Sequence, residues 1–119
     1  MVQDFRNLSV WQRAHQLALE IYLCTRAFPR EELFGLTSQL RRSAYSLPGN
    51  IAEGCGRGGS KDFVRFLRIA LGSACELDYG LLLARDLGYL SQEKQAMFES
   101  TIDEVEKMLS GLINSIQNR

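Results

Sequence analysis

The sequence has few of the residues that mark an enzyme, a metal site or a membrane span. It has one histidine and three cysteines, without a Cys-x-x-Cys or Glu-x-x-His pair, so it offers no catalytic residue, metal-ligand set or cofactor site. No apolar run approaches the roughly 20 residues that cross a bilayer. The first residues, among them Gln3, Asp4 and Arg6, are too polar for a signal peptide. We therefore expect a cytoplasmic protein that is not an enzyme and has no membrane contact.

The chain also lacks net charge, because 14 Lys and Arg balance 14 Asp and Glu. A general attraction to nucleic acid or anionic lipid is therefore not indicated. The charges are nevertheless unevenly placed. Residues 38–72 contain six cations and two carboxylates, a balance of plus four, whereas residues 91–119 contain three cations and five carboxylates, a balance of minus two. Such polarity can orient a partner or another copy of the chain.

The length of 119 residues is enough for one hydrophobic core, so residues 1–119 are expected to form a single domain. The three cysteines are expected to be free thiols. Cys24 and Cys75 are predicted to be small buried apolar side chains. Cys55 lies between two glycines, and for that reason we expect it to be exposed.

Four segments have helical periodicity, and no segment has the pattern of a strand. The first helix is predicted to begin at Ser9, which has Gln12 three positions later in the spacing of a capping box, and to stop at Phe28-Pro29. The second is predicted over about residues 38–54. Pro48 lies inside it and removes a backbone donor, so we expect a kink there.

Four glycines within residues 54–59 predict a tight turn, after which Ser60 should cap a third helix over about residues 61–87. This helix has two apolar stripes, so two of its faces are expected to be covered. Gly88 should end it, and Ser91 should cap a fourth helix that runs to about residue 118. Helices of this length joined by short turns indicate an all-α fold, an antiparallel up-down-up-down four-helix bundle.

The polar residues of the second and third helices are the main candidates for function. A hairpin that turns near Gly58 would place Arg41 or Arg42 near Glu76. The same register would place Glu53 near Arg65, and Asn50 near Leu67 and Arg68. Asn50, Glu53 and Glu76 are therefore predicted to form a structural polar network with these arginines, and the alternative is that the arginines face a partner.

The glycine-rich turn superficially resembles a phosphate loop, but Ser60 and Lys61 are in inverted order and a helix precedes them. Free amides at the start of the third helix, with Arg57, Lys61 and Arg65 around them, would still suit an anion. The hypothesis is a nucleic-acid contact formed by Arg41, Arg42, Arg57, Lys61, Arg65 and Arg68.

The aromatic residues have separate expected roles. His15 should lie at the surface or the edge of the core, where a single histidine cannot form a metal site. Trp11 and Tyr22 are predicted to be buried in the core. The candidates for a subunit interface are Tyr45, Tyr79 and Tyr89.

Several short runs occur in an order that resembles a known family, the four-helix bundle proteins that include the 23S rRNA intervening-sequence proteins. The runs are Leu8-Ser9-Val10-Trp11-Gln12, Phe28-Pro29, Phe34-Gly35-Leu36, Gln39-Leu40-Arg41-Arg42-Ser43, Asn50-Ile51-Ala52-Glu53-Gly54, Arg57, Phe66-Leu67, Ile69-Ala70, Gly72-Ser73 and Glu76-Leu77.

The resemblance implies a ring-like homo-oligomer, with a pentamer favoured. The chain also looks like the accessory subunits of diversity-generating retroelements, which are basic rings that bind a reverse transcriptase and its RNA. Other members are encoded inside inserts of ribosomal RNA genes. This chain departs from the accessory proteins in being neutral overall.

These observations favour an oligomeric interaction protein that binds rRNA or another structured nucleic acid through the basic region of the second and third helices. The alternative is a protein-binding assembly adaptor without nucleic-acid contact, whose arginines are all paired internally.

Overall fold

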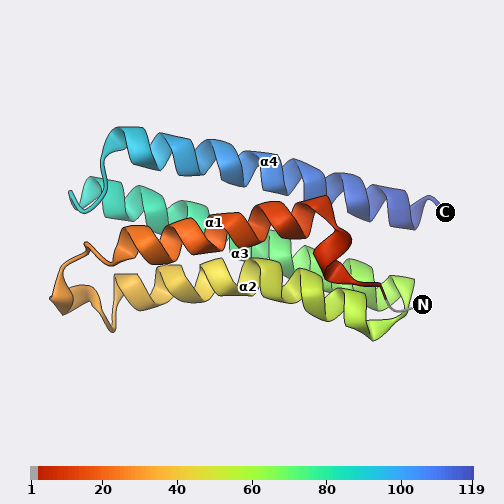
Figure 1. Ribbon diagram of the computed structural model, residues 1–119. Coiled ribbons are helices and arrows are strands. Elements are labelled where there is room, and N and C mark those ends of the chain that lie inside the picture. Colours follow the sequence, from red (N-terminus) through yellow and green to blue (C-terminus); the bar gives the residue numbers. More distant parts are fainter. Residues whose placement is uncertain (1–2) are drawn as a thin grey trace.

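In the computed structural model, which describes residues 3–119, four long helices make up most of the chain (Figure 1). They are α1 (Ser9–Thr25), α2 (Leu36–Arg57), α3 (Ser60–Asp86) and α4 (Gln92–Gln117). Two short 3₁₀ helices, η1 (Phe5–Asn7) and η2 (Arg30–Glu32), precede α1 and α2. No strand occurs within the described residues. The predicted all-α fold with four packed helices is confirmed.

The helices lie side by side in an elongated body of 46 × 23 × 19 Å. α2 packs most extensively against α3, and further contacts join α3 to α4, α1 to α2 and α1 to α4. The colours in Figure 1 run in alternate directions along consecutive helices. Along the α2–α3 pair, Ser46 meets Ser73, and the α-carbon of Gly80 faces Leu40. This register differs by only two or three residues from the one predicted for the hairpin.

The core follows the apolar stripes that the sequence predicts. Burying a large aliphatic or aromatic side chain stabilises a fold by roughly 1.5–3 kcal/mol. Each helix supplies such side chains, and the largest with less than 2 % exposure are Leu17, Ile21, Leu40, Leu47, Ile51, Leu67, Leu77, Leu81, Phe98, Ile102, Val105 and Leu109. Within residues 3–119, none of the helices combines the length and the apolar content needed to span a bilayer.

The helix ends agree with the sequence in part. Ser91 caps α4, and its side chain accepts a hydrogen bond from the backbone N–H of Lys94 at 3.1 Å. The predicted capping box at Ser9 is wrong, because Ser9 is already helical and Leu8 is the N-cap without a side-chain bond. The Gln12 amide instead donates to the carbonyl of Arg6 at 2.8 Å, since η1 directly precedes α1 and supplies that acceptor.

α2 is longer than predicted and continues through Pro48 and Gly54 to Arg57. At Gly54, α3 comes so close to α2 that a β-carbon would lie 3.0 Å from side-chain atoms of Phe63 and Phe66. Glycine therefore suits this helical position. The left-handed turn falls at Gly58, with φ of 84°. The kink expected at Pro48 stays a prediction.

Two predictions of cysteine exposure are wrong, for Cys55 on α2 and for Cys75 on α3. Cys55 is buried, because it lies on the inner face of the last turns of α2 and not in a loop. Cys75 is exposed on α3, and Cys24 on α1 is half-buried. The reason is that Ala74 and Leu77 take the inward positions of α3, which turns Cys75 outward.

Candidate functional site: a basic end of the α2–α3 hairpin

Four of the six predicted cations gather where α2 ends and α3 begins. Lys61, Arg65 and Arg68 follow one another at spacings of four and three on α3, which places them on one face of the helix. Arg57 belongs to the last turn of α2, and all four residues are exposed. In the part of the chain that the structure describes, neither Lys61 nor Arg68 forms an ion pair.

Two of these cations share one aromatic ring. The guanidinium carbon of Arg57 lies 5.0 Å from the ring centroid of Phe66, and that of Arg65 lies 4.5 Å from it. Phe66 is itself only 8 % exposed, so its position is fixed by packing. Cation–π attraction therefore holds two positive groups from different helices beside one another at the surface.

The carboxylates near these cations bind them weakly. Arg57 Nε lies 3.7 Å from Glu53 Oε2, and Arg65 Nε lies 3.4 Å from Asp62 Oδ1. About half of each side chain is exposed in both pairs, and pairs of this kind contribute roughly 0–1 kcal/mol. An external anion can therefore compete for both arginines. The predicted contact of Glu53 with Arg65 is wrong, because Arg65 turns toward Phe66 and Asp62.

The other two predicted cations do not join this group. Arg41 faces α1, where its Nε donates to Thr25 Oγ1 at 2.9 Å and its guanidinium lies 5.2 Å from the ring of Tyr22. Arg42 donates to the side-chain oxygen of Gln39 within α2. At about 1.5 Å of rise per residue, Arg42 lies roughly 22 Å along the helix from Arg57. The six cations therefore form one cluster of four and two separate positions.

The predicted polar network has different members. Asn50 Nδ2 donates to the carbonyl and the hydroxyl of Ser46 at 2.8 and 2.9 Å. The hydroxyl groups of Ser46 and Ser73 lie 2.7 Å apart, and Ser73 donates to the carbonyl of Ile69. The hydrogen bonds of Asn50 are therefore to Ser46 within α2 and not to Arg68.

Glu76 does not take part in this network. It lines a shallow groove between α2 and α3, and within residues 3–119 no arginine pairs with it. The predicted pairing of Glu76 with Arg41 or Arg42 is wrong, since Arg41 is turned toward α1 and Arg42 is bonded to Gln39.

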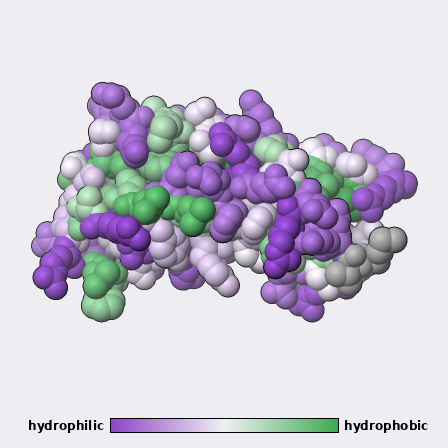
Figure 2. Space-filling model, viewed as in Figure 1, coloured by the Kyte–Doolittle hydropathy of each residue, from purple (hydrophilic) through white to green (hydrophobic). Residues whose placement is uncertain are grey.

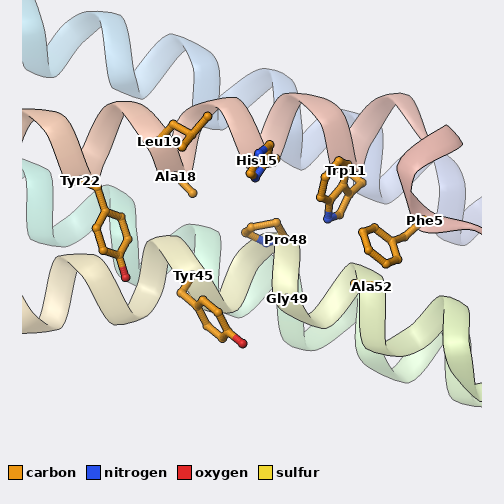
Figure 3. Close-up of a pocket in the computed structure, with 10 residues that line it drawn as sticks. All are labelled: Phe5, Trp11, His15, Ala18, Leu19, Tyr22, Tyr45, Pro48, Gly49 and Ala52. Atoms are coloured by element: carbon orange, nitrogen blue, oxygen red, sulfur yellow. The ribbon is translucent and has the colours of Figure 1, made fainter.

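A second surface feature, an apolar groove between α1 and α2, was not predicted from the sequence (Figure 3). It encloses about 450 Å³. The residues that line it are Phe5, Trp11, His15, Ala18, Leu19, Tyr22, Tyr45, Pro48, Gly49 and Ala52. Figure 2 shows hydrophobic side chains among hydrophilic ones on the face that α1 and α2 present.

The groove corrects two predictions about aromatic residues. Tyr22 is 42 % exposed and Trp11 is half-buried, so both line the groove and neither belongs to the central core. His15 is exposed, as expected, and stacks on Trp11 with the ring centroids 4.8 Å apart. Periodicity indicated that Trp11 and Tyr22 face the bundle, but it could not show that α2 presents Pro48, Gly49 and Ala52 opposite them and leaves a groove.

The sequence and the fold of this chain both match known proteins. Residues 6–111 match the family of 23S rRNA-intervening sequence proteins. The chain belongs to this family. A crystal structure of a protein of unknown function from the S23 ribosomal protein family of Bacteroides thetaiotaomicron superimposes with a TM-score of 0.78 at 27 % identity. The match covers 87 % of this chain and 97 % of the other. No curated protein matches the sequence.

In this intervening-sequence family member, the α3–α4 face is acidic. Asp78 on α3 lies near Glu99, Asp103 and Glu106 of α4, and its buried Oδ1 has no hydrogen-bond partner among residues 3–119. Burial, and then the three nearby carboxylates, raise the pKa of Asp78 above its ordinary value of 3.8. No group of His, Cys, Asp and Glu among residues 3–119 is arranged to hold a metal ion. The negative end of the charge asymmetry predicted from the sequence therefore lies on this face.

Proposed function

We propose that this protein is a non-catalytic, homo-oligomeric RNA-binding protein that contacts phosphates through Arg57, Lys61, Arg65 and Arg68. The observation that carries the proposal is the convergence of Arg57 and Arg65 on Phe66, beside two cations without an ion-pair partner among the described residues. The ligand that we propose is rRNA or another structured RNA, since residues 6–111 match the family of 23S rRNA-intervening sequence proteins.

The binding step is the neutralisation of phosphates and the release of their counterions. Four phosphate contacts correspond to a slope of log affinity against log salt of roughly −3 to −4. Because the chain is neutral overall, this attraction is local to the hairpin end, and one copy would bind weakly.

Self-assembly would compensate for that weakness. A homo-oligomer, with the pentamer favoured by the family resemblance, presents several basic hairpin ends to one RNA, and linked sites raise the overall affinity without new contacts. We therefore treat assembly as part of the proposed function.

The second candidate function is a protein-binding adaptor. The specific observation in its favour is the α1–α2 groove, which is almost entirely apolar and open to solvent. Pockets of this volume and composition are typical binding sites for apolar groups.

The two functions are separated by RNA binding measured as fluorescence anisotropy with 23S rRNA fragments over a range of salt concentrations. A triple variant, Arg57→Glu, Lys61→Glu and Arg65→Glu, should bind at least about tenfold more weakly and with a shallower salt slope. The matched control replaces Lys94, Lys107 and the exposed Arg26 by Glu and should lose much less affinity.

Circular dichroism would confirm that both triple variants are folded. Unchanged affinity in the folded hairpin variant would refute the basic cluster as the contact. Wild-type protein without salt-sensitive RNA affinity even at low salt would favour the adaptor.

A further inference from the structure

Phe34 is the most exposed large hydrophobic side chain of those the structure describes, at 94 % exposure. It lies between η2 and α2 in the connection from α1, next to Leu33, which is 49 % exposed. An aromatic side chain that protrudes in this way would remove about 150–250 Å² from water if a partner covered it. The position therefore suits a contact with another molecule.

The base of this protrusion is well fixed. Glu32 accepts a hydrogen bond from the backbone N–H of Leu36 at 3.1 Å and another from the hydroxyl of Tyr89 at 3.0 Å. The N–H of Gly35 also bonds to the carbonyl of Glu32. Phe34 is thus held between two anchored neighbours, and a partner would lose little binding energy in ordering the backbone of this connection.

The α1–α2 groove is concave, whereas Phe34 protrudes. Its floor consists of small or compact residues, Ala18, Pro48, Gly49 and Ala52 (Figure 3). From Trp11 to Tyr22 its wall on α1 extends for about three helical turns. A volume of about 450 Å³ is large enough to take an aromatic side chain and part of an aliphatic neighbour.

Charge at the two surfaces is also complementary. Arg41 lies over the ring of Tyr22 at one end of the groove, and Arg6 lies 4.5 Å from the ring of Phe5 at the other. Glu31, three residues before Phe34, is exposed, and no ion pair forms on it among residues 3–119. Arg6 is already paired with Asp4 at 3.3 Å, so the acidic group beside the apolar protrusion matches the end of the groove where Arg41 lies.

We propose that Phe34 of one copy inserts into the α1–α2 groove of a second copy, with Glu31 placed toward Arg41. This inference rests on the self-assembly in the proposed function and specifies the contact that produces it. The protrusion and the groove are different surfaces of the same chain, so the contact is heterologous and leads to a ring where the rotation closes.

One side chain does not make a stable interface, which commonly buries about 1,200–2,000 Å². Exposed apolar residues that line the groove supply further area: Leu19 at 46 %, Tyr22 at 42 % and Tyr45 at 70 % exposure. The groove therefore belongs to a wider apolar surface that a second copy can cover.

The test compares the mass of wild-type protein with that of two variants by sedimentation over a range of concentrations. Phe34→Glu removes the protrusion. Gly49→Leu fills the groove, and the fold should accept it, because a β-carbon at Gly49 makes ordinary contacts of 3.5 Å with the Tyr45 ring. Each variant should dissociate at a concentration at least about tenfold higher than the wild type does, a loss of about 1.4 kcal/mol or more.

Two matched controls should keep the wild-type mass. Leu87→Glu places the same charge on another exposed apolar residue, which is 50 % exposed. Gly111→Leu makes the same glycine substitution on α4, where a β-carbon has no neighbour within 4 Å.

A mixture of the two variants gives the sharpest result. The Gly49→Leu copy keeps an intact Phe34, and the Phe34→Glu copy keeps an intact groove, so together they should form a one-to-one dimer that neither forms alone. If assembly is lost in each variant but not restored by mixing, or if either variant assembles like the wild type, the insertion of Phe34 is refuted. If either variant assembles like the wild type, this result refutes the contact but not self-assembly. A wild type that is monomeric at every concentration would refute assembly, while the RNA titration would still test the basic cluster.

Discussion

The hydroxyl groups of Ser46 on α2 and Ser73 on α3 lie 2.7 Å apart, at the middle of the most extensive helix pair. We expect Ser46→Ala and Ser73→Ala each to lower the free energy of unfolding by about 1 kcal/mol, since each removes a partner from a mostly buried polar group. Urea unfolding of both single variants and the double variant would give the coupling energy. A coupling near zero would show that this bond does not stabilise the pair, and Ser100→Ala on the exposed face of α4 should change stability by less than about 0.5 kcal/mol.

The partly buried carboxylate of Asp78 predicts a pH-dependent gain in stability on substitution. Because its pKa is raised in the folded state, first by burial and then by Glu99, Glu106 and Asp103, the charged form destabilises the fold. This penalty is complete at pH above the raised pKa and disappears as the pH falls to the ordinary value of 3.8.

Asp78→Asn should therefore raise the melting temperature by a few degrees at about pH 7 and have little effect at about pH 3. Thermal unfolding at several pH values would measure this. Equal effects at both pH values would rule out a titration effect.

Cys75 is exposed but should react slowly. Burial, the hydrogen bond to Glu106 at 3.4 Å, and the charges of Glu106 and Asp78 all raise its pKa above the ordinary value of 9.0. Only the thiolate is a nucleophile, so Glu106→Gln should speed alkylation of Cys75 by iodoacetamide several-fold at about pH 8. Mass spectrometry would resolve each cysteine, and Glu104→Gln, which lies nearer Arg13, is the control. A rate at Cys75 that Glu106→Gln does not change would contradict this account.

Two glycines of α3 should respond oppositely to the same substitution. A β-carbon at Gly80 would lie 2.6 Å from a methyl carbon of Leu40, which is 1 % exposed and cannot move into solvent. Gly80→Ala should therefore lower stability by about 1–2 kcal/mol through overpacking. At Gly72 no side chain among residues 3–119 lies within 4 Å of such a carbon, so Gly72→Ala should raise stability by about 0.5–1 kcal/mol through helix propensity. Chemical denaturation of both variants would show whether the signs differ.

Much of the fold could be predicted because core positions and helix ends carry local signals. The spacing of Leu67, Leu77 and Leu81 identifies an inward face of α3, and Ser91 satisfies the orphan amide of Lys94 at the start of α4. The α2–α3 register followed from the position of the turn and the constant rise of a helix.

The candidate site was harder to predict because long side chains choose between partners that the sequence does not rank. Arg41 and Arg42 are neighbours in sequence, but a helix turns them about 100° apart, so one reaches α1 and the other stays on α2. The exposure of Cys55 was predicted wrongly because glycines on both sides suggested a loop, whereas α2 continues as a helix to Arg57. The apolar groove depends on small residues of α2 facing large ones of α1, which is a tertiary property.

Glu32 joins two connections that are distant in the sequence, since it bonds to Leu36 at the start of α2 and to Tyr89 between α3 and α4. Thermal fraying of either connection must break this carboxylate's bonds, so the two connections should open as one cooperative unit in amide exchange. A mechanical force applied at Phe34 would also be transmitted through the hydrogen bond between Glu32 and Tyr89 to α3 and α4.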